Sequence, residues 1–534
     1  MIQSPSARTK KTTKILALTA LLFALLPCDA PAQLTARKAA LSTAHPIATR
    51  AGLRVLQQGG TAADAAVAVA FALSVVHPQA SGLGGGGFAL YYDAETSGVW
   101  TLDFREVAPR AAKREMFSDA APAAKAGALA AGVPSTVAGL DALHKRFGVR
   151  EWKTLLAPAI VLAGEKRPDD AELAADIEAA RSQRGLDITA PVVTPALAST
   201  LTRLAEAGPR DFYEGNLAKL LVEETRAAGG ILGFRDLEEY EPIWRAPLKL
   251  RYGQYEIYTP PPPSSGGLVI GATLNILGEI DVKSYQTPAF LHQMLEAQRR
   301  AGIDRLRYVG DPLGGRIPYR ELLSQARAEA WRRSIRADRV TATSTLTEPG
   351  VLATTGQHTT HFTIADAQGN IATVTLGLGD LFGSGAFLPS LGFHLNAAMV
   401  DFTSGANALD PLKRPASPMT PTIILREGHP FLAMGARGGT SIASTMLQVF
   451  LNVTVFGKPL TEAVAAPRYH HAAIPDEVLY ERNLAPQATL DSLNGRGHGV
   501  AARHPIGDVH AILFENDRLV AVADPRRGGS PGGY

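Results

Sequence analysis

The amino-acid sequence predicts an α+β fold in which β-sheets are layered between helices, rather than a row of separable domains. Two observations carry this prediction. Residues 110–225 are rich in Ala, Leu and Glu at helical spacing, for example AELAADIEAARSQ at 171–183. Beyond residue 359, β-branched runs and short turns dominate instead. Segments of both kinds interleave where the two parts meet, and no internal repeat is evident, so we expect one interwoven unit.

The first elements are a predicted helix pair at 45–76, which the Gly59-Gly60 break divides. Asp64 lies close to the start of the second helix, where a carboxylate stabilises the positive end of the helix dipole. A cluster of glycines and then a strand, FALYYD at 88–93, follow this pair. The next expected elements are a strand-like stretch at 249–260 and helices at 268–280 and 293–310.

The part that begins at Thr359 is expected to consist mainly of strands. Thr359–Ala365 and Ile371–Leu376 are β-branched runs joined by the turn sequence DAQGN, which predicts a hairpin. Short strands follow, with one long helix near 440–455. This part is therefore the β-rich complement of the helical first part.

The N-terminal 32 residues have the layout of a secretory signal peptide. Arg8 to Lys14 is a basic region, Ile15 to Leu26 is an apolar run of 12, and Ala30-Pro31-Ala32 offers a small-residue cleavage site. A run of 12 falls short of the roughly 20 apolar residues that span a bilayer, so this segment is not expected to be a membrane anchor. No membrane span is expected in the chain that remains after the signal peptide is removed. We therefore expect export to the periplasm or the extracellular space, with a mature chain that starts at Gln33.

Composition and charge exclude several classes of function. The chain has 53 Lys and Arg against 50 Asp and Glu, and without residues 1–32 the two counts are equal. This balance argues against a nucleic-acid binder, which would carry a clear basic excess. The only cysteine, Cys28, belongs to the predicted signal peptide. A disulfide framework, a cysteine-ligated zinc site and a thiol nucleophile are therefore excluded for the mature chain.

The motifs predict neither a cofactor nor a metal site. A P-loop, an HExxH helix, an EF-hand loop and a GxSxG elbow are all missing from the sequence. GLGGGG at 82–87 matches the dinucleotide fingerprint only formally, because a predicted helix precedes it and a strand follows it. These glycines are better explained by the close passage of two backbone segments. His470 and His471 are neighbours on a strand and point apart, which favours structural roles over a shared metal.

Thr359-Thr360-His361, at the start of the predicted hairpin, has two interpretations. A threonine pair in a strand usually reflects β propensity alone. A threonine at a free chain terminus, however, is a self-contained nucleophile, because its own α-amine accepts the proton of the hydroxyl. The same hydroxyl can first attack the preceding carbonyl, that of His358, and cut the chain. The pattern itself has no specificity, so the choice depends on the rest of the sequence.

Long blocks of sequence supply that context. In chain order they are GGTAADAAVAVAFALSVVHPQASGLGGGGF (59–88), LDFREVAPR (102–110), GVPSTVAGL (132–140), PPPSSGG (261–267), AGIDRLRYVGDP (301–312), TTHFTIADAQGNIATVT (359–375), KRPASPMTPTI (413–423), GGTSI (438–442), APRYHH (466–471) and DPRRGGSPGGY (524–534). Together these blocks resemble the γ-glutamyltranspeptidase family of N-terminal nucleophile hydrolases. The resemblance implies an αββα sandwich made from a precursor that is cut into a large subunit, 33–358, and a small subunit, 359–534. Thr359 is then the nucleophile and the first residue of the small subunit.

The resemblance also implies roles for individual residues. Arg105, in DFRE, corresponds to the arginine that binds the α-carboxylate of the substrate, a task that suits a fixed guanidinium fork. Ser417 corresponds to a serine of the same carboxylate pocket, and Asp401 corresponds to the aspartate that pairs with the α-ammonium. Gly438 and Gly439 correspond to the glycine pair whose backbone amides form the oxyanion hole.

Four positions depart from the pattern of the family. The family usually has Thr-x-Asn where this chain has Gly377-Leu378-Gly379, and Ala398 and Pro418 replace two further polar side chains of the substrate pocket. Each hydrogen bond lost to a charged group weakens binding by about 1.5–3 kcal/mol. A slipped strand register would bring Thr375 into the place of Gly377, since side chains on one face repeat every two residues. The match through Gly369-Asn370 argues against such a slip.

These observations predict an exported γ-glutamyltranspeptidase-like enzyme that cuts itself at His358–Thr359 and acts as a heterodimer of the two products. It would transfer or hydrolyse a γ-glutamyl group of glutathione-like donors through an ester on Thr359, with water, an amino acid or a peptide as acceptor. Two alternatives stay open. One is a related amidase for another acyl group, such as glutaryl, for which Arg105 and Ser417 would still bind a distal carboxylate. The other is a catalytically weak or dead homologue, which Gly377 and Pro418 motivate.

Overall fold

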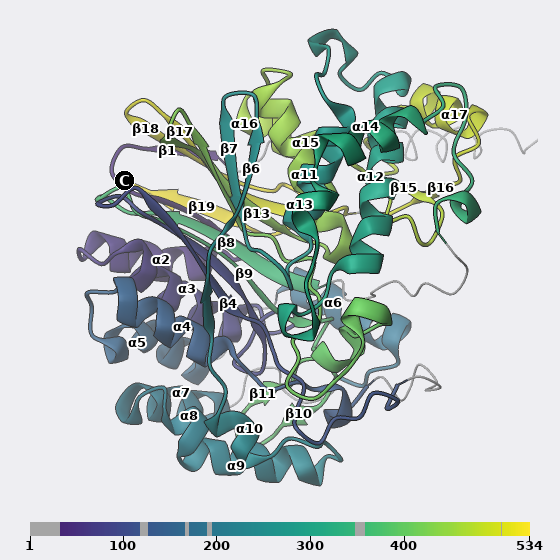
Figure 1. Ribbon diagram of the computed structural model, residues 1–534. Coiled ribbons are helices and arrows are strands. Elements are labelled where there is room, and N and C mark those ends of the chain that lie inside the picture. The colour runs from purple at the N-terminus through teal and green to yellow at the C-terminus, as the bar shows by residue number, and fades with distance from the viewer. Residues whose placement is uncertain (1–32, 118–125, 166–169, 189–194, 348–357, 504) are drawn as a thin grey trace, which may run out of the picture.

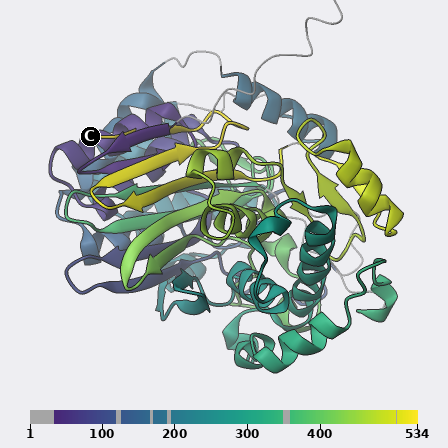
Figure 2. The same ribbon diagram turned by 90° about the horizontal axis from the view of Figure 1, so that it is seen from above.

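Figure 1 shows the computed structural model of the chain, which describes residues 33–117, 126–165, 170–188, 195–347, 358–503 and 505–534. The predicted signal peptide, residues 1–32, lies outside these ranges. Within them, no helix combines the length and the apolar character needed to cross a bilayer. The described chain forms four layers, with two sheets at the centre and helices on both outer faces (Figures 1 and 2). This arrangement confirms the predicted αββα sandwich.

One central sheet has seven antiparallel strands in the order β19-β2-β8-β9-β3-β4-β5. Their bounds are β2 Ala40–Thr43, β3 Gly86–Asp93, β4 Gly98–Phe104, β5 Ile243–Arg245, β8 His358–Ala365, β9 Ile371–Gly379 and β19 Ser530–Gly533. The predicted hairpin is confirmed as β8 and β9, although β9 runs three residues further than expected, to Gly379. Strands from both ends of the chain therefore meet in this sheet, and Thr359 lies on a strand near its centre.

The other central sheet also has seven antiparallel strands, in the order β1-β18-β17-β13-β12-β7-β6. Their bounds are β1 Gln33–Ala36, β6 Leu248–Tyr252, β7 Tyr255–Thr259, β12 Thr422–Arg426, β13 His429–Arg437, β17 Asp508–Glu515 and β18 Arg518–Ala523. The stretch at 249–260, predicted as one segment, is the hairpin of β6 and β7, because Gly253 turns the chain with a φ of 55°. Between the sheets, apolar side chains such as Leu90, Ala433 and Ile512 pack together.

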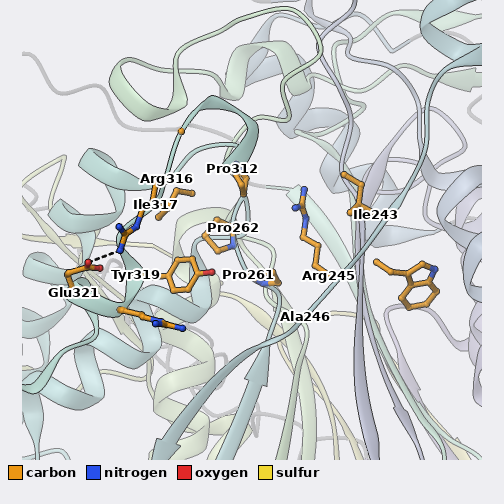
Figure 3. A pocket seen from close by; sticks show the side chains of 13 residues that line it. Ile243, Arg245, Ala246, Pro261, Pro262, Pro312, Arg316, Ile317, Tyr319 and Glu321 are labelled. Atoms are coloured by element: carbon orange, nitrogen blue, oxygen red, sulfur yellow. Dashed lines mark hydrogen bonds and ion pairs between the residues drawn. The ribbon is translucent and has the colours of Figure 1, made fainter.

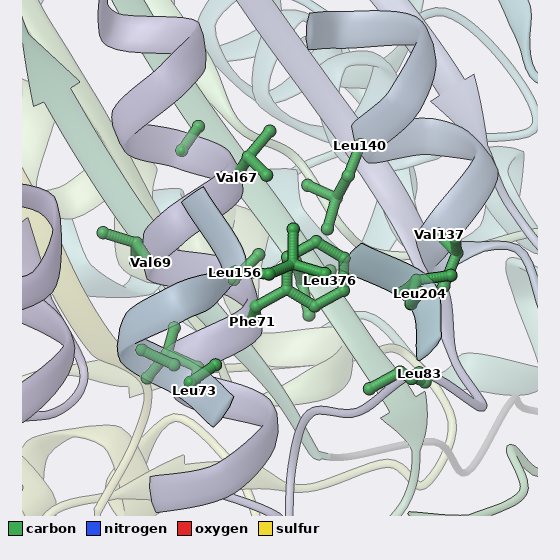
Figure 4. Packing of buried hydrophobic residues seen from close by; sticks show 14 of the residues in the cluster. Val67, Val69, Phe71, Leu73, Leu83, Val137, Leu140, Leu156, Leu204 and Leu376 are labelled. Carbon is green, nitrogen blue, oxygen red and sulfur yellow. The ribbon is translucent and has the colours of Figure 1, made fainter. Parts of the chain in front are cut away.

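Helices cover the outer face of each sheet. The layer over the β8 sheet contains α2 (Pro46–Gln57), α3 (Ala62–Val76), α4 (Thr136–Phe147), α5 (Trp152–Gly164), α7 (Pro195–Ala207), α8 (Asp211–Glu214) and α9 (Asn216–Ala227). The layer over the other sheet contains α11 (Gly266–Leu277), α12 (Pro288–Tyr308), α14 (Gln325–Arg333), α15 (Ile442–Thr454) and α16 (Leu460–Ala465). Figure 4 shows how Phe71 of α3 packs among Leu140, Leu156 and Leu376, so that helices and sheet share one core.

Shorter elements lie around these layers. They are α6 (Ala171–Arg184), α10 (Phe234–Glu238), α13 (Tyr319–Leu322), α17 (Gln487–Gly495), the paired strands β10 (Phe387–Leu388) and β11 (Phe393–His394), and a small sheet of β14 (Tyr469–His470), β15 (Val478–Tyr480) and β16 (Val500–Ala502). Of these, α6 contacts Asp380 near its C-terminal end through Arg184 and Arg437 near its N-terminal end through Glu172.

The predicted helix pair at 45–76 is confirmed as α2 and α3. Thr61 caps α3, since the backbone N–H of Asp64 donates to Thr61 Oγ1 (3.2 Å) and the N–H of Thr61 donates to Asp64 Oδ2 (2.9 Å). This reciprocal capping box explains why a helix restarts directly after the Gly59-Gly60 break.

The glycines at 82–87 connect α3 to β3, which is the reverse of the dinucleotide-binding order. A Cβ on Gly84 would lie 2.1 Å from the carbonyl oxygen of His394, and one on Gly85 would lie 2.2 Å from that of Gly377. Both neighbours are backbone atoms, which cannot rotate away. The prediction that these glycines allow two backbone segments to pass closely is therefore confirmed.

Candidate active site

Thr359 lies at an irregularity near the start of β8. His358 pairs with Gly379, whereas Thr360 pairs with Leu376, so the register shifts by one residue at Thr359. The Thr359 side chain is only 3% exposed, and its Oγ1 has no hydrogen-bond partner among the described residues. The neighbouring Thr360 Oγ1 and several other buried threonine hydroxyls share this property, so the irregularity of β8 is what distinguishes Thr359.

Gly377 lies directly against the irregularity. A Cβ on Gly377 would lie 2.9 Å from Thr359 Cα and 3.1 Å from the carbonyl oxygen of His358. The slipped register considered above does not occur, because Thr375 pairs with His361 and its Oγ1 lies 2.8 Å from His361 Nδ1. The missing side chain at 377 therefore leaves room for the backbone on both sides of the His358–Thr359 bond.

The fold brings Arg105 and Asp401 into direct contact across 296 residues of chain. Arg105 Nη2 donates to Asp401 Oδ2 and Arg105 Nη1 donates to Glu106 Oε2, both at 2.5 Å, and all three side chains are buried. Burial raises the pKa of Asp401 to about 6, and the ion pair with Arg105 offsets part of this increase. Burial raises the pKa of Glu106 as well. The guanidinium of Arg105 is thus shared by two carboxylates. The sequence did not predict the contact with Glu106, for which the position directly after Arg105 in DFRE is the only sign.

Asn407, which the sequence analysis missed, links the segments of Asp401 and Ser417. Asn407 Nδ2 donates to the carbonyl oxygen of Asp401 (2.8 Å), and Asn407 Oδ1 accepts from the backbone N–H of Ala416 (2.8 Å). Ser417 is buried, and its Oγ accepts from the backbone N–H of Met419 (3.2 Å). As a hydroxyl, Ser417 can still donate one hydrogen bond to a ligand.

Gly438 and Gly439 form a tight turn between β13 and α15. Their φ values are 130° and 60°, which other residues rarely adopt. Three residues before the turn, Gly435 packs so closely on His361 that a Cβ there would lie 2.3 Å from its ring. Since Thr359 lies two residues before His361, the glycine turn and the Thr359 hydroxyl are at the same end of the sandwich.

Arg437, the residue before this turn, is buried and bound on three sides. Its guanidinium contacts His77 Nε2 (3.0 Å) and Asp508 Oδ2 (3.0 Å), and it also forms an ion pair with Glu172. Although burial opposes ionisation, His77, Arg437 and Arg527 together hold the pKa of Glu172 far below its usual range. Arg437 therefore ties the glycine turn to α3, α6 and β17, a role that no local sequence pattern indicates.

The side chain of His358 lies between the end of β9 and the end of α6. His358 Nε2 is 3.7 Å from Asp380 Oδ1, and Asp380 Oδ2 is 3.2 Å from Arg184 Nε. Burial, followed by nearby cations with Arg437 first among them, lowers the pKa of His358 to about 3, so the imidazole is neutral at ordinary pH. Burial raises the pKa of Asp380, and Arg184 offsets part of this effect.

Among the described residues, most of the predicted site residues are buried, and Gly438 is half-buried. Thr359 is 3% exposed and Asp401 is 5% exposed. A cavity of about 630 Å³ lies elsewhere, between β5 and α13, with Ile243, Arg245 and Tyr319 in its wall (Figure 3). None of the predicted site residues lines this cavity.

The two neighbouring histidines, His470 and His471, have different partners. His470 Nδ1 lies 2.8 Å from Ser444 Oγ, and His471 Nε2 lies 3.3 Å from Asp476 Oδ1. This confirms that the two rings point apart. Within the described ranges, no group of three or more His, Cys, Asp or Glu side chains is arranged to hold a metal ion.

Comparison with known proteins gives consistent matches along the chain. The family profile described as Gamma-glutamyltranspeptidase matches residues 48–534. A glutathione hydrolase proenzyme of Escherichia coli (strain K12) is 35% identical over 529 residues, which cover 92% of this chain and 91% of that protein. Among solved structures, cephalosporin acylase from Bacillus halodurans has a TM-score of 0.85 at 27% identity, covering 94% of this chain and 97% of that one. A Helicobacter pylori γ-glutamyltranspeptidase chain has a TM-score of 0.53 at 35% identity, covering 57% of this chain and 93% of that one.

Proposed function

Because the chain belongs to the γ-glutamyltranspeptidase family, we propose that it cuts itself at His358–Thr359 and then moves an acyl group through Thr359. Membership makes it an enzyme of the γ-glutamyltransferase and glutathione hydrolase type. The observation that carries the proposal is the position of Thr359, whose buried side chain lies at an irregularity of β8 and against the empty position at Gly377. In this proposal the protein is exported, and residues 1–32 are removed on the way.

Self-cleavage starts from the intact chain. Thr359 Oγ attacks the carbonyl carbon of His358, a C–O bond forms, and the C–N bond of the peptide breaks. The hydroxyl proton passes to the departing nitrogen, which becomes the α-amine of Thr359. Water then hydrolyses the ester, which restores the Thr359 hydroxyl and leaves a carboxylate on His358. The products, residues 33–358 and 359–534, stay together as a heterodimer, because strands of both lie side by side in each central sheet.

The second reaction uses the same hydroxyl. The free α-amine of Thr359 accepts the hydroxyl proton as Thr359 Oγ attacks the acyl carbonyl of a donor. Backbone amides of Gly438 and Gly439 stabilise the negative charge that develops on the carbonyl oxygen. The amine of the donor leaves with a proton, and an acyl ester stays on Thr359. Water or the amino group of an amino acid or a peptide then takes the acyl group.

The donor that these residues fit is a γ-glutamyl amide such as glutathione. In the uncut chain, Arg105 forms an ion pair with Asp401 as well as one with Glu106. The α-amino-acid end of the donor is zwitterionic and carries both charges. Its carboxylate replaces Asp401 as the partner of Arg105, and its ammonium replaces Arg105 as the partner of Asp401. Ser417 donates a further hydrogen bond to the carboxylate. The related protein of Escherichia coli is a glutathione hydrolase proenzyme by name, which supports this choice.

A second candidate is an amidase for a different acyl group. The close structural similarity to a cephalosporin acylase, together with Ala398 and Pro418 in the pocket, favours it. A glutaryl group would keep the contacts of its distal carboxylate with Arg105 and Ser417 but would leave Asp401 without a cation. Comparing the hydrolysis of γ-glutamyl-p-nitroanilide and glutaryl-p-nitroanilide separates the two candidates. A strong preference for the γ-glutamyl compound eliminates the second.

Self-cleavage is tested on the purified protein. We expect two fragments on a denaturing gel, with N-termini at Gln33 and Thr359, and one intact chain for Thr359→Ala. Turnover that disappears in Thr359→Ala rejects an inactive homologue. A wild-type protein that stays intact, with the same turnover in Thr359→Ala, would overturn the proposal.

A further inference from the structure

Asp380 is a partly buried carboxylate that the proposed chemistry does not use. It follows Gly379, where the backbone turns out of β9 with a φ of 90°. Its side chain is held from one side, because Asp380 Oδ2 lies 3.2 Å from Arg184 Nε and the backbone N–H of Leu381 donates to Asp380 Oδ1 (2.8 Å). On the other side it faces His358 Nε2 at 3.7 Å. The carboxylate is therefore oriented, and it points at the residue that precedes the proposed cut.

The position of His358 indicates where an acyl donor binds. In self-cleavage, Thr359 Oγ attacks the carbonyl of His358, and in the second reaction the same atom attacks the carbonyl of the donor. Both carbonyls must therefore occupy one place relative to Thr359 and the glycine turn. Groups that contact the side chain of His358 in the uncut chain accordingly face the donor once His358 has moved away. Asp380 is such a group.

The segments that carry Asp380 and Asp401 are hydrogen-bonded to each other. The backbone N–H of Ala397 donates to the carbonyl oxygen of Leu378 (2.8 Å), so the end of β9 is bonded to the chain just before the short helical turn Ala398–Asp401. Asp380 is one of the charges that raise the pKa of Asp401, which places the two carboxylates within electrostatic reach. Two neighbouring carboxylates repel each other unless a cation lies between them.

His358 does not supply that cation. Its imidazole is neutral at ordinary pH, so in the uncut chain it fills space beside Asp380 without neutralising it. Cations near the two carboxylates include Arg184 at Asp380, and Arg105 and the buried Arg305 at Asp401. When the α-carboxylate of a donor takes over Arg105, Asp401 loses its hydrogen-bonded cation, and the added carboxylate makes the pocket more negative. An α-ammonium offsets that charge.

We propose that Asp380 is a specificity-determining residue that binds the α-ammonium of the donor together with Asp401, in the place that His358 vacates. The inference rests on the proposed γ-glutamyl activity. It explains how the pocket holds an ammonium although Gly379 and Ala398 carry no polar side chain. A second charged contact of this kind strengthens binding by about ten- to a hundredfold.

The test compares a probe with an ammonium and a probe without one on the self-cleaved enzyme. Asp380→Asn removes the charge but keeps an oxygen for the N–H of Leu381. We expect the KM for γ-glutamyl-p-nitroanilide to rise at least tenfold with a much smaller change in kcat. The inhibition constant of glutarate, which lacks the amine, should change far less. Asp517→Asn, an exposed carboxylate in the turn between β17 and β18 (72% exposed), is the matched control and should behave as wild type.

The outcomes separate the inference from the function it rests on. An equal weakening of γ-glutamyl-p-nitroanilide and glutarate would assign Asp380 to structural support and overturn the inference, as would unchanged values for both. A wild-type enzyme that does not hydrolyse γ-glutamyl-p-nitroanilide would overturn the proposed function itself, and the inference with it. If Asp380→Asn yields no folded heterodimer, Asp380→Glu decides by the same comparison, since it keeps the charge and moves it by one methylene.

Discussion

Replacing Gly377 by alanine probes the proposed self-cleavage at the scissile bond itself. A Cβ at this position would lie 2.9 Å from Thr359 Cα, 3.1 Å from the carbonyl oxygen of His358 and 3.2 Å from that of Ala80. All three neighbours are backbone atoms, so none of them can rotate out of the way. The start of β8 must shift instead, and Thr359 shifts with it.

The size of the effect follows from these distances. Carbon atoms in contact are ordinarily about 3.5–4.0 Å apart, so relief of the overlap requires a displacement of about 0.6–1 Å. A displacement of about 1 Å in a reacting group costs on the order of a hundredfold in rate. Overpacking of this kind also destabilises the fold by roughly 1–3 kcal/mol. We therefore expect the rate constant of self-cleavage in Gly377→Ala to be about 10- to 100-fold below that of wild type.

The assay follows the conversion of newly synthesised intact chain into two fragments on a denaturing gel. Gly495→Ala, at the end of α17, is the control, because a Cβ there has no neighbour within 4 Å and should leave the rate unchanged. Thermal unfolding of each variant reports whether the fold survives. If folded Gly377→Ala is cut at the wild-type rate, the reasoning that this bond requires an empty position at 377 is refuted.

Two further measurements test the charges of the site. Because burial raises the pKa of Asp401 to about 6, its carboxylate is charged above that pH and neutral below it. The KM for γ-glutamyl-p-nitroanilide should therefore rise as the pH falls from about 7 to 5, by up to about tenfold per unit of pH below the pKa; a flat wild-type profile contradicts this. Glu172→Gln removes the carboxylate that pairs with Arg437 and Arg527. Breaking a buried ion pair costs about 3–5 kcal/mol, and we expect the free energy of unfolding in urea to fall by an amount near the lower end of this range. Glu329→Gln, which breaks an exposed ion pair with Arg333, should change the free energy of unfolding by less than about 1 kcal/mol. Equal stability of the two variants would count against a buried network at Arg437.

Much of the fold follows from local sequence patterns. The capping pair Thr61 and Asp64, the glycine break before it and the β-branched runs on either side of DAQGN each act within a few residues, so their elements were predictable. The stretch at 249–260 was predicted less well, because a single residue, Gly253, with a positive φ turns one apparent strand into two. Its composition resembles that of a continuous strand.

The candidate site was predictable only where a residue lies in a recognisable block. Arg105, Asp401 and Ser417 were found in that way, and their roles stay predictions. Asn407 and Asp380 were missed, because their partners are chosen by the packing of loops and not by neighbours in sequence.

By itself, the sequence determined the fold class, the division into a helical and a strand-rich part, the family and the threonine most suited to be the nucleophile. Only the tertiary structure decided which polar groups meet: Arg105 with Asp401, Arg437 with Glu172, and Asp380 with the neutral His358. It also changed the meaning of Gly377, which is a lost side chain in the sequence and lies tightly against the backbone of His358 and Thr359 in the fold. The physical reason is range. Helix, strand and turn preferences act over a few residues, whereas ion pairs, burial and steric room depend on segments that the packed core brings together from hundreds of residues apart.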